Sequence, residues 1–256
     1  MLYIANTGSV TVTATNCILR NNTATVFKFN TGNHTLNLSG SQIYGNVVTT
    51  NGGVASFAPG TSPGNQTISA TNTSFYENKG VYGAVFYLES ASAGQNVELL
   101  NCTFLDNVAT EKGVVCLSSS SSTVGQTIHI TQAEIHSNSA GVYGGFLSFE
   151  SATNIPTQLT LTQVNCTGNS AQYGGVVYTN LGGSSQMMMD RVTASNNHAV
   201  SNGGFANLQV KSSGIQAVTV TDSSFDSNSA TGSGGAFALS SSSTQKQSIA
   251  MTGCNM

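Results

Sequence analysis

The 256-residue sequence contains few charged residues, no tryptophan and only three prolines. Charged residues make up 7% of the chain, against about 25% in a typical globular protein. The seven Lys and Arg residues are scattered along the chain, whereas a nucleic acid requires a clustered basic surface. No apolar run approaches the roughly 20 residues of a membrane-spanning helix. We therefore expect neither a nucleic acid partner nor a membrane span in this segment.

The cysteines follow no pattern of a metal site or a disulfide framework. Their number is odd, no CxxC motif occurs, and they stand at Cys17, Cys102, Cys116, Cys166 and Cys254. We expect most of them to be buried as small apolar side chains.

An asparagine recurs through the whole chain at intervals of 24 to 32 residues. The column consists of Asn22, Asn46, Asn78, Asn107, Asn138, Asn169, Asn197 and Asn228. A small or aliphatic residue follows two positions later, as in Ala109 and Ala140, and an apolar residue precedes by three, as in Phe104 and Ile135. Paired apolar positions such as Ile128 and Ile130 lie upstream, and glycine turns lie downstream. Such fixed columns are the signature of a repeat architecture.

Within each repeat the apolar positions alternate, which is the periodicity of β-strands. Three short strands per repeat without a helical pattern predict an all-β fold, a right-handed parallel β-helix of about eight coils of about 30 residues. We assign residues 1–256 to this single β-helix domain. The asparagine column is expected to form an internal ladder, with each amide bonded to those in the coils above and below. The glycines supply positive φ angles at the turns.

The columns resemble the FxxN and GGA[ILV] repeats of chlamydial polymorphic outer-membrane proteins. FxxN stands here as Phe75–Asn78, Phe104–Asn107 and Phe225–Asn228, and a GGA-type turn as Gly234–Phe237. The resemblance implies the β-helical passenger of a secreted surface protein with a role in adhesion. The membrane β-barrel of that family has no counterpart in this sequence.

Both ends of the sequence read as parts of a coil. Solenoids normally carry polar caps that cover their terminal strand edges, and neither end shows one. We expect an internal stretch of a longer chain, or a rod whose ends stack head to tail on other copies or on neighbouring β-helix segments. The start also lacks a signal peptide, so an extracellular or cell-surface location requires a leader outside this stretch.

Chemistry-bearing residues form no recognisable catalytic set. Glu77 and Asp106 share one column on neighbouring coils, and His129, Glu134 and His136 lie within one coil. We interpret both groups as solvated surface, and expect no catalytic residues, no metal site and no cofactor. A carbohydrate-active β-helix enzyme, a lyase or hydrolase with an unrecognised site, is the leading alternative.

The outward positions of the first strand form a hydroxyl-rich strip. It includes Thr13, Thr15, Thr71, Thr131, Thr160, Thr162, Thr219 and Thr221. Threonine is favoured at exposed strand positions by its β-branch alone, and Glu98, Leu100, Met188 and Asp190 interrupt the strip. Ice binding, or the binding of glycans, remains a further alternative for this surface.

Seven N-x-[ST] sequons are N-glycosylation acceptors if the chain is secreted by a eukaryote. They lie at Asn21, Asn33, Asn37, Asn65, Asn72, Asn101 and Asn165, all outside the ladder column. The function that we predict is that of an extracellular structural or adhesive segment of a surface or filament-forming protein. It would act as a rigid, non-enzymatic scaffold whose loops contact glycans or host and cell-surface proteins.

Overall fold

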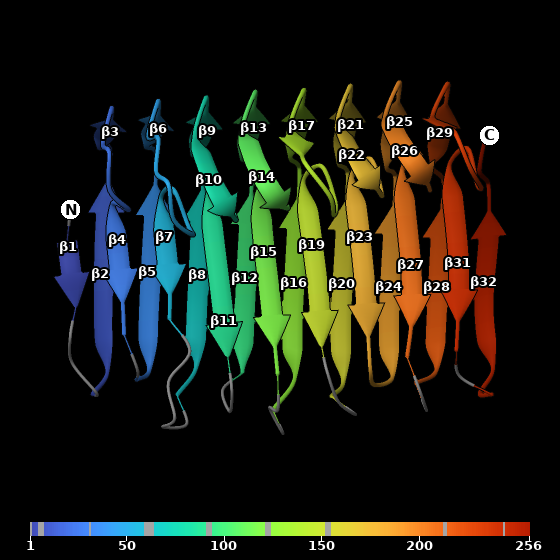
Figure 1. The fold of residues 1–256 in the computed structure, drawn as a ribbon, viewed down its shortest axis with the longest axis horizontal. Coiled ribbons are helices and arrows are strands. Elements are labelled where there is room, and N and C mark those ends of the chain that lie inside the picture. The colour runs from blue at the N-terminus through green and yellow to red at the C-terminus, as the bar shows by residue number, and fades with distance from the viewer. Residues whose placement is uncertain are drawn as a thin grey trace.

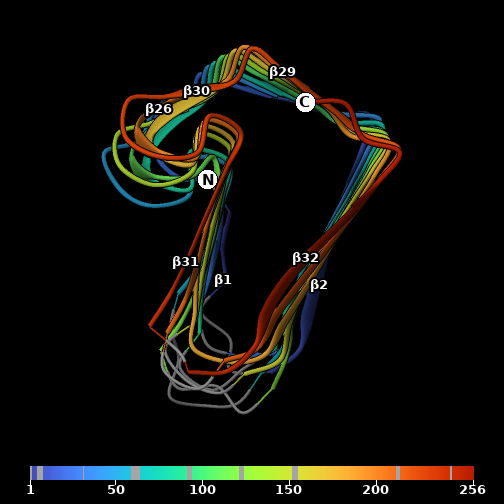
Figure 2. The same cartoon turned by 90° about the vertical axis from the view of Figure 1, so that its right-hand side faces the viewer.

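The computed structural model describes residues 2–4, 8–30, 32–58, 64–90, 94–120, 124–151, 155–211, 214–242 and 244–256. It confirms the predicted right-handed parallel β-helix (Figures 1 and 2). Equivalent residues of neighbouring coils are commonly 31 positions apart, as in the pairing of Ile130 with Leu161. No helix in these ranges is long and apolar enough to cross a membrane.

Two sheets form one long side and the top of the rod in Figure 1. Sheet I is the long one and comprises β2 (Val10–Thr15), β5 (His34–Ser39), β8 (Gln66–Thr71), β12 (Gln95–Leu100), β16 (Gln126–Thr131), β20 (Thr157–Thr162), β24 (Ser185–Asp190), β28 (Gln216–Thr221) and β32 (Gln247–Thr252). Sheet II follows the first bend and comprises β3 (Ile18–Arg20), β6 (Gln42–Tyr44), β9 (Ser74–Tyr76), β13 (Thr103–Leu105), β17 (Glu134–His136), β21 (Asn165–Thr167), β25 (Thr193–Ser195) and β29 (Ser224–Asp226).

The other two sheets complete each coil. Sheet III is short and comprises β10 (Lys79–Tyr82), β14 (Val108–Lys112), β18 (Ser139–Ala140), β22 (Ser170–Tyr173), β26 (His198–Asn202) and β30 (Ser229–Ala230). Sheet IV faces sheet I and comprises β1 (Leu2–Ile4), β4 (Phe27–Phe29), β7 (Ala55–Phe57), β11 (Phe86–Ser90), β15 (Val115–Ser119), β19 (Leu147–Ser151), β23 (Val177–Leu181), β27 (Ala206–Val210) and β31 (Phe237–Ser241). In six of the described coils, sheet III adds a fourth short strand to the three that were expected.

The core fills the space between sheets I, II and IV. The paired positions of sheet I point inward, and Ile128 and Ile130 are fully buried. The phenylalanines of the FxxN motifs also face inward, where the rings of Phe75 and Phe104 stack with centroids 4.8 Å apart. Phe146 of the next coil meets Phe104 edge-on at 4.9 Å. Apolar side chains therefore pack both within and between coils, which is why the columns recur in the sequence.

Left-handed backbone conformations produce the bends. The first glycine of each predicted turn has a positive φ, as at Gly144 (58°) and Gly174 (68°). The bend between sheets I and II also uses this conformation at non-glycine residues, including Gln132 and Arg191 (each 53°). The bend before the asparagine column does the same, for example at Glu77 (55°). Because such conformations cost an L-residue about 1–2 kcal/mol, the packing on either side must hold them.

Candidate functional site

The eight asparagines of the predicted column form one continuous ladder inside the bend between sheets II and III. Asn138 is fully buried, and its Oδ1 accepts hydrogen bonds from the backbone N–H and the Nδ2 of Asn107 at 3.1 and 2.9 Å. Its own Nδ2 donates to Asn169 Oδ1 at 3.0 Å and to the carbonyl of Phe104 at 3.0 Å. The same pattern links the column from Asn22 to Asn228. These asparagines hold the coils together, and all but the half-buried end members Asn22 and Asn228 are closed to a ligand.

A second, glutamine ladder stands inside the start of sheet I. Gln95 Nε2 donates to Gln66 Oε1 at 2.9 Å, and Gln126 Nε2 donates to Gln95 Oε1. Thr157 and Ser185 replace glutamine in the next two coils, and Gln216 and Gln247 restore it afterwards. This ladder was missed in the sequence analysis, although the recurring Gln-x-[Ile/Val] pattern before the paired positions signals it.

The threonine strip lies on the outer face of sheet I. Thr131, Thr160 and Thr162 are contiguous, because they occupy neighbouring coils at matching register. Thr13 and Thr15 are exposed on β2, and Asn37 and Ser39 separate them from Thr71 on β8. Thr219 and Thr221 lie beyond β24. The structure therefore divides the strip into three separate patches and the isolated Thr71.

Three of the interruptions of the strip, Glu98, Leu100 and Met188, are exposed, and Asp190 is half-buried. Leu100 and Met188 expose 44% and 48% of their surface. Asp190 accepts a hydrogen bond from Thr221 Oγ1 at 2.7 Å and pairs with Arg191 at 2.7 Å. These two contacts, the Thr221 bond first, hold the pKa of Asp190 below its usual value. An apolar and charged interruption of this kind breaks the flat hydroxyl lattice that ice binding would use.

The strip occupies two outward columns of sheet I. A third outward column lies beside it and was not predicted. It runs through Thr11, Thr35, Thr67, Asn96, Thr127, Gln158, Gln186, Ala217 and Ser248. Its members are uncharged and most carry a hydroxyl or an amide. This column edges two hollows on sheet I.

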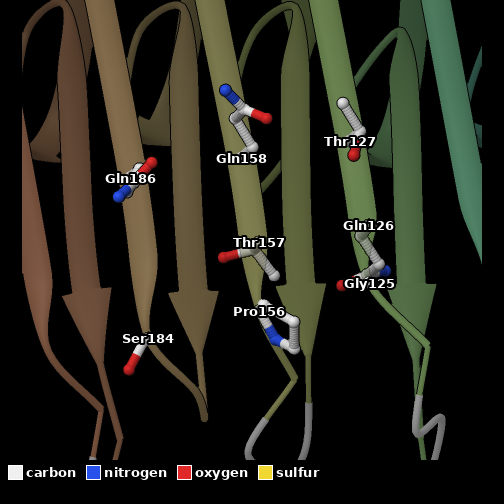
Figure 3. A pocket seen from close by; sticks show the side chains of 8 residues that line it. All are labelled: Gly125, Gln126, Thr127, Pro156, Thr157, Gln158, Ser184 and Gln186. Carbon is white, nitrogen blue, oxygen red and sulfur yellow. The ribbon is translucent and has the colours of Figure 1, made fainter.

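The larger hollow is a pocket of about 390 Å³ at the start of β16, β20 and β24 (Figure 3). None of its lining residues is charged; they are Gly125, Gln126, Thr127, Pro156, Thr157, Gln158, Ser184 and Gln186. A neighbouring hollow of about 300 Å³ shares Gly125 and Thr127 with it and extends toward Asn65 and Asn96. The two hollows together border one side of sheet I over several coils.

Two polar atoms of the inward glutamine-ladder column have no hydrogen-bond partner in the described structure. They are Gln126 Oε1 and Thr157 Oγ1, and their residues expose only 1% and 4% of their surface. Because both side chains lie on the inner face of sheet I, the pocket does not reach these atoms. The pocket itself presents the outward hydroxyl and amide groups of Thr127, Gln158 and Gln186.

The sequons lie on the surface to different degrees. Asn21, Asn33, Asn65, Asn72 and Asn101 are exposed, whereas Asn37 on β5 and Asn165 on β21 are half-buried. Asn101 Nδ2 donates to Asn72 Oδ1 of the preceding coil at 2.7 Å. Asn165 Nδ2 donates to Glu134 at 2.9 Å. The exposed sequons are thus the more accessible acceptors.

The charged groups considered in the sequence make local contacts. Glu77 and Asp106 are exposed at consecutive bends, and His136 pairs with Glu134 at 2.7 Å. His129 lies apart from that pair, on β16. Across the described part of the chain, no group of three His, Cys, Asp or Glu residues is placed to hold a metal ion. No described cysteine forms a disulfide, and Cys102, Cys116 and Cys166 are buried.

A cluster of aromatic and charged residues covers the outer face of sheet IV. Lys112 pairs with Glu150 at 2.7 Å, and its Nζ lies within 6 Å of the Tyr82 and Tyr143 ring centroids. The ring of Tyr143 stacks on that of Tyr178 at 4.3 Å. Burial opposes the charge of Lys112, but the hydrogen bond to Glu150, the charge of Glu150 and smaller contributions from neighbouring groups together raise the lysine pKa. The cluster fastens the sheet III turns onto sheet IV, and the sequence gives no sign of it because its members come from different coils.

Comparisons with protein-family models, with curated proteins and with solved structures give no match.

Proposed function

We propose that this chain is an extracellular structural or adhesive segment of a surface or filament-forming protein. Its task would be rigid reach, with contacts made by its outer faces and loops. The observation that supports this most is the uninterrupted asparagine ladder, from Asn22 to Asn228. A continuous ladder whose six inner asparagines are fully buried resists bending between coils. Eight coils at about 4.8 Å extend over about 40 Å.

The resemblance to chlamydial outer-membrane protein repeats supports a place on a cell surface. The motif positions have a physical role in the fold: Phe75 and Phe104 stack inside, and the asparagine three residues later joins the ladder. Repeats of this kind build rods of any length, because each coil contacts only its neighbours. Further β-helix coils, in the same chain or in another copy, are therefore the first partners that we propose, followed by glycans and cell-surface proteins.

The terminal strands of the described coils favour such stacking. Leu2 and Tyr3 on β1 expose 45% and 51% of their surface, and Leu239 and Ile249 at the other end expose 40% each. Unpaired strand edges with exposed apolar side chains are templates for a further strand. A coil placed on either edge would bury these side chains.

Antibodies against the chain provide the test of location and role. They should label intact, unpermeabilised source cells, and beads coated with the purified rod should adhere to a surface that the source cells contact. Labelling only after permeabilisation would contradict the proposal, as would beads that adhere no better than beads coated with heat-denatured chain.

Glycan binding at sheet I is the second candidate function. The uncharged column beside the threonine strip and the hollows along it favour glycans over ice, because exposed Leu100 and Met188 interrupt the hydroxyl surface. Thermal hysteresis measurements distinguish ice binding. Release of reducing ends from polysaccharides would instead support the carbohydrate-active enzyme, and we expect none, since we propose binding without catalysis.

A further inference from the structure

We propose that a cavity on the outer face of sheet IV binds a small free α-amino acid in its zwitterionic form. The cavity lies on the opposite side of the rod from the threonine strip, and the proposal is independent of the adhesive role. The turns that join sheets III and IV curve outward beyond sheet IV (Figure 2), and one of them borders the cavity. The lining residues are Thr25, Lys28, Thr50, Asn51, Ser56, Ala58, Tyr87 and Glu89.

The cavity exists because one coil carries short side chains at two positions. The residue before the left-handed turn glycine is Asn51 in this coil and Tyr82 in the next. Ser56 occupies the outward position of β7, where the next coil has Tyr87 at matching register. The rings of Tyr82 and Tyr87 lie 5.9 Å apart and fill the equivalent space. Because Asn51 and Ser56 are both short, the space between Lys28 and Tyr87 remains open.

Two opposite charges line the cavity without pairing with each other. The ion pairs within the described residues include neither Lys28 nor Glu89. Lys28 is exposed, and its Nζ lies 6.0 Å from the ring centroid of Tyr3. Glu89 is half-buried, and its Oε2 accepts a hydrogen bond from the Tyr87 hydroxyl at 2.7 Å. The two charged side chains start from β4 and β11, two coils and thus roughly 10 Å apart.

A zwitterion matches this arrangement of charges. A lone anion beside Lys28 would also meet the carboxylate of Glu89, and a lone cation beside Glu89 would meet the Lys28 ammonium, so one charge of the site would oppose either ion. An α-amino acid presents its carboxylate to Lys28 and its ammonium to Glu89 at the same time. Both contacts are charge-assisted hydrogen bonds, which are stronger than neutral ones. Asn51, Thr25 and Ser56 supply amide and hydroxyl groups around them.

The size of the cavity restricts the side chain of the ligand. Sites for drug-sized molecules usually hold about 300–1,000 Å³, whereas this cavity has a volume of about 190 Å³. Among its lining residues, Ala58 is the only one with an aliphatic side chain. A large apolar ligand side chain would therefore find neither the space nor the apolar surface that it needs, and we expect glycine or alanine as the ligand.

The test is isothermal titration calorimetry on the whole chain with glycine, L-alanine, L-phenylalanine and galactose. Glycine or L-alanine should give saturable binding, and L-phenylalanine should bind at least about tenfold more weakly than the better of the two. Glycinamide and L-alaninamide lack the carboxylate of their parent amino acids, and glycolate and L-lactate lack the ammonium. Each analogue should bind at least about tenfold more weakly than its parent, because a charge-assisted hydrogen bond is lost.

Two variants test the charged side chains of the site. Lys28→Gln and Glu89→Gln should each weaken binding of the amino acid about tenfold or more. Glu89→Gln keeps an oxygen that can accept the hydrogen bond of Tyr87. Lys246→Gln and Glu98→Gln make the same changes at exposed positions elsewhere and should leave the affinity unchanged. Circular dichroism checks the fold of each variant.

The pattern of selectivity identifies the role of each charge. In Lys28→Gln the amino acid and its amide should bind alike, because the ligand carboxylate no longer meets a cation. An absence of saturable binding by both glycine and L-alanine would overturn the proposal. So would an amide or hydroxy acid that binds as tightly as its parent, or galactose that binds more tightly than both amino acids. The analogues are titrated into the unmodified chain, so this part of the test holds even if a variant does not fold.

Discussion

Asn107 donates two hydrogen bonds to the single Oδ1 atom of Asn138, one from its backbone N–H at 3.1 Å and one from its side-chain amide at 2.9 Å. The second amide hydrogen of Asn107 is donated to the carbonyl of Phe75 in the preceding coil, at 2.9 Å. One side chain therefore joins three coils. Because both atoms of the amide are fully used, no shorter or isosteric residue can replace asparagine at no cost.

Asn138→Ala should lower the free energy of unfolding by about 3 kcal/mol or more. The substitution removes the side-chain bonds to Asn107, Asn169 and Phe104 and leaves the buried backbone N–H of Asn107 without its acceptor, and a buried group without a partner costs about 1–3 kcal/mol. Urea unfolding followed by circular dichroism measures the change. Asn96→Ala is the matched control, since Asn96 is half-buried on the outer face and bonds only Glu98. An equal loss of unfolding free energy in the two variants would contradict a stabilising role of the ladder.

Gly144→Ala and Gly168→Ala separate steric conflict from backbone strain. Both glycines have a positive φ, of 58° and 68°. A Cβ on Gly144 would lie 2.0 Å from the carbonyl oxygen of Leu147, whereas a Cβ on Gly168 would meet only Ser137 Oγ at 3.7 Å. We expect a loss of about 1 kcal/mol at Gly168, and about 3 kcal/mol or more at Gly144. Thermal unfolding of both variants checks the order, and a reversed order would refute it.

Phe104→Ala should destabilise the rod by about 3–5 kcal/mol, the usual cost of removing a buried phenylalanine. Its ring stacks on Phe75 at 4.8 Å and contacts Phe146 at 4.9 Å. The neighbouring Leu105 points outward and exposes 39% of its surface. Leu105→Ala is therefore expected to cost less than about 1 kcal/mol. Chemical denaturation of the pair tests the inward placement of the FxxN phenylalanines.

Stability should fall as the pH rises from about 9 to about 11. Burial raises the pKa of the Cys102 thiol from 9.0 to about 11, and burial also raises the pKa of Cys116 and Cys166. The folded chain therefore keeps protons that the unfolded chain releases, so stability is complete below about pH 9 and is lost as the pH passes the folded values.

Urea unfolding at a series of pH values measures this alkaline loss. Cys102→Ala should reduce it, by up to about 3 kcal/mol for a shift of this size. Cys254→Ala, at a half-buried position near the end of the chain, serves as the comparison. A Cys102→Ala profile that matches the parent across this range would contradict the prediction. It would mean that the Cys102 thiol has the same protonation in the folded and the unfolded chain at each pH.

Expression through a eukaryotic secretory pathway should give unequal occupancy of the sequons. Exposed Asn65 and Asn101 should be modified more completely than Asn37 and Asn165, whose side chains are half-buried within strands. Peptide mass spectrometry before and after enzymatic removal of N-glycans gives the occupancy. Asn→Gln variants at single sites are the controls. Full glycosylation of Asn165 with none at Asn101 would contradict the prediction that exposure in the folded chain determines sequon occupancy.

Several features of the fold could be predicted because they repeat in the sequence. The asparagine column, the apolar pairs such as Ile128 and Ile130, and the phenylalanines before the ladder each face the same environment in every coil. A repeated environment selects a repeated residue type. The glutamine ladder follows the same rule, and the recurrence of Gln66, Gln95 and Gln126 was available in the sequence.

Other features carry no repeated signal. The left-handed bends between sheets I and II accept Asn101, Gln132 and Arg191 at equivalent positions, because the backbone conformation is imposed by packing on both sides and not by the side chain. The contacts of Lys112 with Tyr82 and Tyr143 join residues about 30 positions apart. Their proximity depends on the register between coils.

The sequence by itself determined the period, the inward columns and thus the parallel β-helix, since burial in a stacked coil restricts each inward position to one class of residue. Only the tertiary structure decided where the outer surface is hollow. The pocket is lined by residues of three adjacent coils, among them Thr127, Gln158 and Gln186, and such neighbours can be identified only once the coils are aligned in space.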